Sequence, residues 1–384
     1  MWGESSRPRD SSTVKNMQTT IILRRVSIPF LEPFRISNGI AATKDSVIVE
    51  IRRDGQSGFG EAGPLTGGAY SSETAESSWT RLEEKLVPLW LESNFDRPEE
   101  VGPAVDKIPG EAFARAAIEG ASWDLAGRET GEPLWKMLGS QLRPVESGVA
   151  IGIFDTLEEL LERVDLYVKQ GYRRTKIKIQ PGWDVEPVRA IRERFGDIPL
   201  MVDANAAYSL GDAGIFKELD QFDMMMFEQP LAGPALADMA ELQRQVKTPI
   251  CADESAESQE ALETMIELGS AKIINIKIQR VGGLTNARRM HDRAREAGLG
   301  VWLGTMPELG VASGQGLHLA TLPGFNYPTD VEASERWYED DLVDPLITLG
   351  NNGSIYIPEG PGMGYTVNRT KLERYTTEQK EFSA

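Results

Sequence analysis

Between residues 176 and 277, a short apolar run with a charged residue at its end occurs five times: Lys176-Ile-Lys178-Ile, Leu200-Met-Val-Asp203-Ala-Asn205, Met224-Met-Met-Phe-Glu228-Gln-Pro, Pro249-Ile-Cys-Ala-Asp253-Glu254 and Ile273-Ile-Asn-Ile-Lys277. The charged residues Lys178, Asp203, Glu228 and Asp253 are 25 positions apart, and Lys277 follows 24 positions later. Apolar runs of this length, separated by helix-length segments, are typical of strands in a parallel sheet. Because the carboxyl ends of barrel strands meet at one mouth, we expect these charged residues to lie together.

A regular alternation of strands and helices begins near residue 145. Residues 147–154 are predicted to form the first strand, Thr156 and Glu159 a capping box for the next helix, and Gly171 its end. The unit recurs through residue 303, which gives seven clear strand starts and a weaker eighth near residues 317–322. These repeated units predict an α/β fold, a parallel (β/α) barrel of the TIM type with its helices outside.

The segments on either side of the barrel predict a second, smaller domain. Residues 21–28 and 46–52 have strand patterns, Asp54-Gly55 indicates a hairpin turn, and residues 73–93 and 110–139 have helical spacing of apolar residues. The expected organisation is a flexible tail over residues 1–20, an α+β capping domain over 21–144, the barrel over 145–344, and a C-terminal segment over 345–384 that returns to the capping domain.

Composition argues against several classes of protein. The formal net charge of −18 disfavours nucleic-acid binding, which needs clustered Lys and Arg. No stretch is long and apolar enough to cross a membrane, and residues 1–20 lack the apolar core of a secretory signal, so we expect a cytoplasmic protein that does not bind membranes. The single cysteine, Cys251, excludes an intrachain disulfide.

The two histidines also narrow the chemistry. His291 lies in a polar helical stretch and is expected on the surface, and His318 has no metal-ligand spacing to another residue. This argues against a zinc hydrolase and against a Ser-His-Asp enzyme. Proton transfer near neutral pH would then come from carboxylates or from lysines with a lowered pKa.

The three acids of the repeat, Asp203, Glu228 and Asp253, are candidate metal ligands. Each alone could be a helix cap, the common role of an acid after a strand. Three at successive strand ends favour a hard cation, Mg²⁺ with Mn²⁺ as the alternative, because all the ligand atoms are oxygens. Asn205 is expected to face the same way as Asp203 and to support it. Glu254 faces away by strand alternation, so we expect a structural or supporting role.

The lysines of the repeat are candidate acid–base groups. If Ile177 and Ile179 pack outward, Lys176 and Lys178 both point into the barrel. Lys176 would then lower the pKa of Lys178 by like-charge repulsion. Lys277 would lie across the mouth, and two lysines flanking a carbon next to a carboxylate suit α-proton chemistry with Mg²⁺.

This combination resembles the enolase superfamily, in which a Lys or His base acts with Mg²⁺ on an enediolate. The Lys-x-Lys, the three acids and the later lysine are similar to the muconate-lactonizing subgroup. Within it, the chain most resembles the o-succinylbenzoate synthases and N-acylamino acid racemases. The resemblance runs from about residue 21 to 369 and is carried by Pro33–Gly39, Lys178–Asp184, Val202–Tyr208, Phe227–Leu231, Lys247–Ser255 and Ile274–Gly283.

The resemblance implies a modified (β/α)7β barrel, a small carboxylate substrate and Lys178 as the base. In the leading hypothesis, a 2-succinyl-6-hydroxycyclohexadiene carboxylate is dehydrated to o-succinylbenzoate, a step of menaquinone synthesis. Lys178 would return its proton to the leaving hydroxyl, and Lys277 would stabilise the intermediate. The alternative is an N-acylamino acid racemase or dipeptide epimerase that uses both lysines, followed by a muconate cycloisomerase. A non-enzymatic barrel that binds Mg²⁺ for structure alone, or a binding protein, stays open, and we expect a homo-oligomer.

Substrate selection is expected in the loops and in one altered segment. Residues 304–316 lack the Arg, His and Asn that the family usually has there, and Glu308 within them is expected to contact or support the substrate. Asp330-Val-Glu332 resembles the paired acids that hold an α-ammonium in dipeptide epimerases. Loops 33–39 and 64–72 should close over the mouth. Their candidate specificity residues are Phe34, Ser37 and Tyr70.

Overall fold

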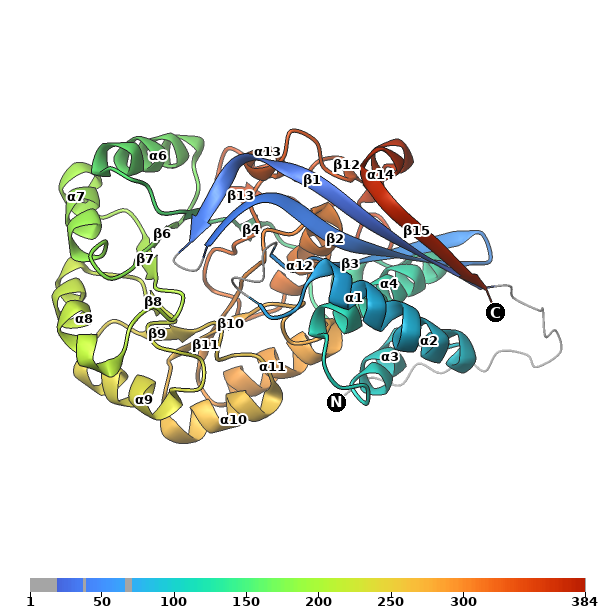
Figure 1. The fold of residues 1–384 in the computed structure, drawn as a ribbon, viewed down its shortest axis with the longest axis horizontal. Helices are drawn as coiled ribbons and strands as arrows, with labels where there is room; N and C mark the ends of the chain where they lie inside the picture. Colours follow the sequence, from blue (N-terminus) through green and yellow to red (C-terminus); the bar gives the residue numbers. More distant parts are fainter. Residues whose placement is uncertain (1–18, 37–38, 66–70, 384) are drawn as a thin grey trace.

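A four-stranded antiparallel sheet lies beside a curled seven-stranded parallel sheet in the computed structural model, which describes residues 19–36, 39–65 and 71–383 (Figure 1). The parallel strands follow the order β5 to β11, and helices α6 to α11 cover their outer side. None of the helices in the described ranges is both long and apolar enough to cross a membrane. Of the expected tail, residues 1–18 lie outside the described residues, and Thr20 already belongs to β1.

The elements of the capping part are β1 (Thr20–Ile36), β2 (Gly39–Arg53), β3 (Gln56–Ala62), α1 (Ala75–Arg81), the π-helical turn η1 (Leu82–Leu86), α2 (Val87–Ser93), α3 (Pro98–Val105), α4 (Ala112–Thr130), α5 (Leu134–Met137), α14 (Arg369–Tyr375) and β15 (Thr376–Ser383). The predicted hairpin turn is confirmed, because Asp54 and Gly55 both have positive φ (49° and 79°) between β2 and β3. The predicted helix over 110–139 is divided, since Gly131 with φ 73° ends α4.

The elements of the barrel are β4 (Val145–Glu146), β5 (Val149–Ile151), α6 (Leu157–Gln170), β6 (Thr175–Lys178), α7 (Val185–Phe195), β7 (Leu200–Asp203), η2 (Leu210–Asp212), α8 (Ala213–Leu219), η3 (Asp220–Phe222), β8 (Phe227–Glu228), α9 (Leu236–Gln245), β9 (Ile250–Ala252), α10 (Gln259–Leu268), β10 (Ile273–Ile276), α11 (Leu284–Glu296), β11 (Gly300–Leu303), α12 (Gly310–Ala320), α13 (Ser334–Trp337), β12 (Val343–Asp344), β13 (Ser354–Ile355) and β14 (Thr366–Val367). The capping box of Thr156 and Glu159 and the end of α6 at Gly171 are confirmed.

The eighth strand predicted near residues 317–322 is wrong, because residues 317–320 belong to α12. Every residue of α12 is buried, and a helix that is apolar all round cannot be told from a strand by its periodicity. The ring closes instead through residues 325–332, where Phe325 bridges Val301 of β11 and Thr329 bridges Ser147 beside β5.

The two histidines are both buried. The surface position predicted for His291 is wrong, since its ring is 1% exposed, stacks on Phe325 and lies 3.1 Å from the Pro323 carbonyl oxygen. His318 accepts a hydrogen bond from the Trp135 backbone N–H, and its Nε2 lies 2.9 Å from the Met363 carbonyl oxygen. Burial lowers the pKa of His318 to about 4, so the ring is neutral and structural.

The C-terminal segment connects to both parts of the chain. Residues 354–355 form β13, which pairs with β4 at the start of the barrel. Strand β15 pairs with β1 and so completes the capping sheet. The first and last described strands of the chain are therefore neighbours in one sheet.

The β1–β2 ribbon reaches from the capping sheet to the barrel mouth (Figure 1). Its Arg35 carbonyl accepts a hydrogen bond from Ile153 at 3.0 Å, and the Phe34 ring packs edge-on against Trp337 at a centroid distance of 5.0 Å. A Cβ atom at Gly152 would lie 2.6 Å from the Arg35 oxygen. The ribbon can therefore dock only because residue 152 is glycine.

Replacing Gly152 by Ala should destabilise the protein by about 1–3 kcal/mol, because the added methyl group forces the ribbon away from the barrel. Urea unfolding measures this change. Gly214→Ala in α8 is the matched control, since nothing lies within 4 Å of the added Cβ. We expect the control to be neutral or to stabilise by about 0.5–1 kcal/mol. Equal stabilities for the two variants would contradict the docking role of Gly152.

Candidate active site

The charged residues of the 25-residue repeat come together at the carboxyl ends of the strands. Lys178 is in register with Asp203, and Asp203 with Glu228, across β6, β7 and β8. Glu228 is in register with Cys251, so Asp253 lies one residue beyond the end of β9. Lys277 directly follows β10. All five residues are at most 6% exposed, so their charges must be compensated locally.

Two lysines approach the acids from strands that are separated in the sheet. The Lys178 Nζ atom lies 2.5 Å from Asp203 Oδ2, and the Lys277 Nζ atom lies 2.9 Å from Asp253 Oδ2. Arg280, which the sequence did not single out, also forms an ion pair with Asp253. The barrel mouth therefore has one lysine amine on β6 and a second lysine amine at the end of β10.

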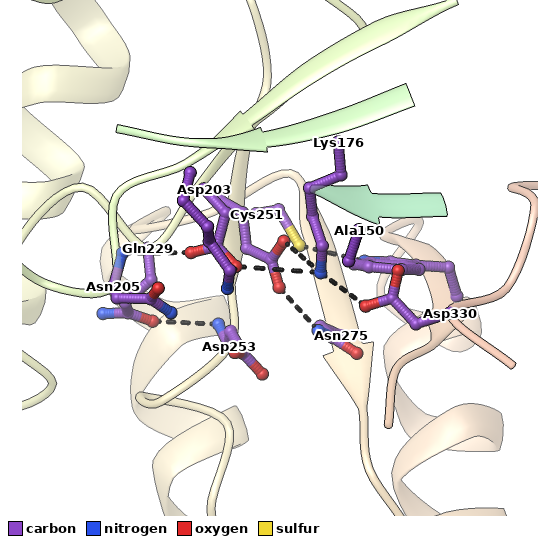
Figure 2. Close-up of polar contacts among 12 residues, drawn as sticks. Ala150, Lys176, Asp203, Asn205, Gln229, Cys251, Asp253, Asn275 and Asp330 are labelled. Atoms are coloured by element: carbon purple, nitrogen blue, oxygen red, sulfur yellow. Dashed lines mark hydrogen bonds and ion pairs between the residues drawn. The ribbon is translucent and has the colours of Figure 1, made fainter. Parts of the chain in front are cut away.

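Lys176 lies among three carboxylates (Figure 2). Its Nζ atom pairs with Asp330, lies 3.2 Å from Glu228 Oε2 and lies 3.7 Å from Asp203 Oδ2. Burial lowers the pKa of Lys176, but these carboxylates raise it more, and the net shift is upward. The ammonium stays charged, and its expected repulsion of Lys178 stays a prediction.

Asp330 and Glu332 enter the site from the segment that closes the barrel. Asp330 Oδ1 lies 2.5 Å from Arg174 Nη2, so this carboxylate is shared by two internal cations, Arg174 and Lys176. Glu332 accepts a hydrogen bond from the Ala150 backbone N–H at 2.7 Å. Burial raises the pKa of Glu332 to about 7. Because Arg174 and Lys176 already neutralise Asp330, this carboxylate differs from one that would bind the ammonium group of a substrate.

Strand alternation predicted that Glu254 faces away from the site, and this prediction is wrong. Strand β9 ends at Ala252, so alternation no longer applies two residues later. Glu254 Oε1 accepts a hydrogen bond from Asn205 Nδ2 at 3.2 Å, and the backbone N–H of Asn205 donates to Asp203 at 3.0 Å. Burial raises the pKa of Glu254 to about 7, and the charges of Asp253 and Asp203 add to this. Asn205 thus joins two acids, as a supporting residue would.

Two amide side chains that the sequence did not single out orient the acids (Figure 2). Asn275 Nδ2 donates to Glu228 Oε1 at 2.8 Å, and Gln229 Oε1 accepts from the Asp253 backbone N–H at 2.8 Å. A Cβ atom at Gly304 would lie 2.2 Å from Asn275 Oδ1, so this glycine makes room for the amide. Alternation could have found Asn275, because it lies two positions before Lys277 on one face of β10.

A pocket of about 430 Å³, part of it open to solvent, lies over the lysines. Its apolar walls come from both parts of the chain, and its lining includes Lys176, Lys178, Lys277, Phe34, Leu65, Met306 and Trp337. Of the predicted specificity residues, Phe34 lines the pocket, whereas Ser37 and Tyr70 lie outside the described residues. Glu308 is buried behind this lining, and burial together with Glu61 raises its pKa to about 7.

Comparison with known proteins identifies the family to which the chain belongs. Residues 18–139 match the mandelate racemase / muconate lactonizing enzyme N-terminal domain, and residues 159–371 match the enolase C-terminal domain-like family. The chain belongs to the enolase superfamily. Members of this superfamily act on small carboxylates and generally use Mg²⁺.

Three superfamily members illustrate the likeness. The o-succinylbenzoate synthase of Geobacillus kaustophilus is 45% identical over 94% of this chain and 96% of its own. The N-succinylamino acid racemase of an Amycolatopsis species is 41% identical over 92% of this chain and 96% of its own. A solved structure of an enolase superfamily member from Listeria innocua matches with a TM-score of 0.91 and 36% identity, over 96% of this chain and 99% of that chain.

The carboxylate oxygens at the barrel mouth suit a hard cation, although the three acids do not converge on one point. In the part of the chain that the structure describes, no three Asp, Glu, His or Cys side chains form a ready metal site. Asp203 and Asp253 instead turn toward lysines. Glu228 Oε2 is fully buried and accepts no well-aligned hydrogen bond from the described residues. Burial and the charge of Asp203 raise the pKa of Glu228 to about 8, even though Lys176 lies 3.2 Å from Oε2 and opposes the shift.

Mg²⁺ should raise the thermal unfolding temperature, because a ligand that binds only the folded chain adds about 2.7 kcal/mol at a hundredfold excess over its Kd. Glu228→Gln should weaken Mg²⁺ binding at least about tenfold, measured by titration calorimetry. Glu332→Gln is the matched control, since it changes a buried acid of the same pocket outside the expected ligand set. Wild-type Mg²⁺ affinity in Glu228→Gln would show that the ligand set is wrong.

Proposed function

We propose that this chain is a Mg²⁺-dependent o-succinylbenzoate synthase, which dehydrates a 2-succinyl-6-hydroxycyclohexadiene carboxylate. The observation that carries the proposal is the placement of Lys178 and Lys277 in the lining of one pocket, each paired with a different acid. Relatives of that name at 45%, 44% and 40% identity support it.

Asp203, Glu228 and Asp253 would hold the cation, which would offset the negative charge that develops on the substrate carboxylate when its α-proton leaves. Lys178, as the neutral amine, takes that proton from the carbon next to the carboxylate. The resulting ammonium donates the same proton to the hydroxyl on the neighbouring carbon, which departs as water as the third double bond of the aromatic ring forms. Lys277, as an ammonium, stabilises the charge from the opposite face. Phe34, Leu65 and other apolar walls exclude bulk water.

Lys178→Ala should reduce o-succinylbenzoate formation by about 10³-fold or more, because the variant lacks the proton acceptor. The assay follows product formation with Mg²⁺ and with chelator. Lys169→Ala in α6 is the control, since this lysine is exposed and pairs with Asp165 one turn away. Thermal unfolding checks that both variants fold. Full activity in folded Lys178→Ala would remove Lys178 as the base.

Racemisation of an N-succinylamino acid is the second candidate, because the same two lysines can exchange a proton on either face of one carbon. A relative named for this reaction is 41% identical. An N-acylated substrate carries no ammonium, which agrees with an Asp330 that Arg174 and Lys176 already neutralise. The same pairing makes a dipeptide epimerase, which must hold a free ammonium, a weaker candidate.

Incubation of an enantiopure N-succinylamino acid with enzyme in D₂O tests the second candidate. If it is right, NMR shows deuterium at Cα and polarimetry shows loss of optical rotation. Lys178→Ala and Lys277→Ala should each abolish racemisation, because each removes the group on one face. Absence of exchange in an enzyme that forms o-succinylbenzoate would leave dehydration as the function.

A further inference from the structure

A buried lysine outside the pocket connects the capping domain to the barrel mouth. Lys44 in β2 is fully buried. Its ammonium donates to the Gly63 carbonyl and, at 2.9 Å, to the Met306 carbonyl, and it lies 3.5 Å from the Pro64 carbonyl oxygen. One cation thus holds together the chain that leaves β3 and the loop that follows β11.

Gly63 is also held from the barrel side. Its backbone N–H donates to Gln279 Oε1 at 2.6 Å, and Gln279 lies two residues after Lys277. A Cβ atom at Gly63 would lie 3.0 Å from Lys44 Nζ and 2.6 Å from Glu61 Oε1. A side chain at residue 63 would push these two groups aside, and the contacts with Lys44 and Gln279 hold the backbone of residue 63 between the two domains.

The two segments that Lys44 joins each supply one wall of the pocket. Leu65 follows Gly63 by two residues and lines the pocket from the capping domain. Met306, whose carbonyl binds the ammonium, lines the same pocket from the barrel. The distance between these apolar walls therefore depends on the Lys44 contacts.

The positive charge of Lys44 is compensated by carboxylates that do not line the pocket. Burial lowers the pKa of Lys44 on balance, although the nearby carboxylates of Glu61 and Glu308 oppose the shift. Glu61 in turn accepts hydrogen bonds from the backbone N–H groups of Leu309 and Ala312 at the start of α12, at 3.0 and 3.1 Å. Lys44 is not part of the pocket lining, so its ammonium acts on the substrate through the backbone it holds.

We propose that Lys44, assisted by Gln279, is a positioning residue that sets the shape of the substrate pocket. By holding the carbonyls of Gly63 and Met306, it fixes the separation of the Leu65 and Met306 walls over the reacting carbon. This role rests on the proposed function where turnover is measured. Wall spacing governs how the body of the substrate binds, whereas proton transfer belongs to Lys178 and Lys277.

Kinetics of o-succinylbenzoate formation test the proposal. Lys44→Met should raise KM by about tenfold and change kcat by less than about threefold, the pattern of lost uniform binding. Gln279→Leu removes the other hold on Gly63 without changing any charge, so it remains informative if Lys44→Met does not fold. It should raise KM in the same direction. Unchanged KM in both folded variants, or in Gln279→Leu alone where Lys44→Met does not fold, would overturn the proposal.

Glu119→Ala separates positioning from general loosening of the two domains. Glu119 in α4 is buried and accepts a hydrogen bond from the Thr285 backbone N–H at 3.1 Å, at the start of barrel helix α11. Its loss should lower the unfolding temperature and leave KM unchanged, because neither Glu119 nor Thr285 lines the pocket. A KM increase equal to that of Lys44→Met would show that any weakening of the domain contact has the same effect, which overturns the specific role.

Hydrogen exchange measured by mass spectrometry gives a readout that needs no substrate. In Lys44→Met or Gln279→Leu, peptides covering residues 58–65 should lose protection, and in Lys44→Met those covering 303–309 should as well, while α11 keeps it. Glu119→Ala should show the reverse. If the wild-type enzyme forms no o-succinylbenzoate, the proposed function fails, and this exchange pattern alone decides the positioning role. Unchanged protection of both segments in folded Lys44→Met would overturn it.

Discussion

The ion pairs of Lys176 connect parts of the barrel that are distant in sequence. This ammonium lies on β6 and contacts the carboxylates of Asp203, Glu228 and Asp330. Asp330 belongs to the segment that closes the ring, where regular strand hydrogen bonding has given way to isolated bridges. Removing one partner from such a buried cluster leaves an uncompensated charge, which costs about 3–5 kcal/mol. The same contacts that close the barrel therefore also hold two of the acids expected to bind the cation.

The capping domain is joined to the barrel by acids that cap barrel helices. Glu61 of β3 accepts from the first backbone N–H groups of α12, and Glu119 of α4 accepts from Thr285 at the start of α11. The N-cap positions of both helices, Leu309 and Gly283, make no side-chain cap hydrogen bond. Each helix thus obtains from the other domain the acceptor that its own sequence lacks. Because a helix N-terminus also favours negative charge, these contacts combine hydrogen bonding with electrostatic attraction.

The sequence predicted best the parts of the site that lie on a regular strand or directly after its end. Lys178, Asp203 and Glu228 follow from the period of the repeat, because strand register carries that period into space. Glu254 was predicted to face away from the site, and the partners of Asp330 inside the barrel were not predicted, since each residue lies where strand alternation has ended. Lys44 shows a different limit. Val47, Val49 and Ile51 mark one buried face of β2, but the opposite face is covered by the barrel, a contact between segments far apart in sequence.

The pairing of β15 with β1 constrains the order in which the capping sheet assembles. Residues 376–383 pair with residues 20–26 of β1, so the sheet that starts the fold gains its last strand after the entire barrel has been synthesised. Contacts of such long sequence separation close slowly, because the loop between them must be ordered first. Until then β1 presents an unpaired edge, the kind of surface at which nascent chains associate with one another. Cotranslational folding of this protein is therefore expected to finish at the domain where it began.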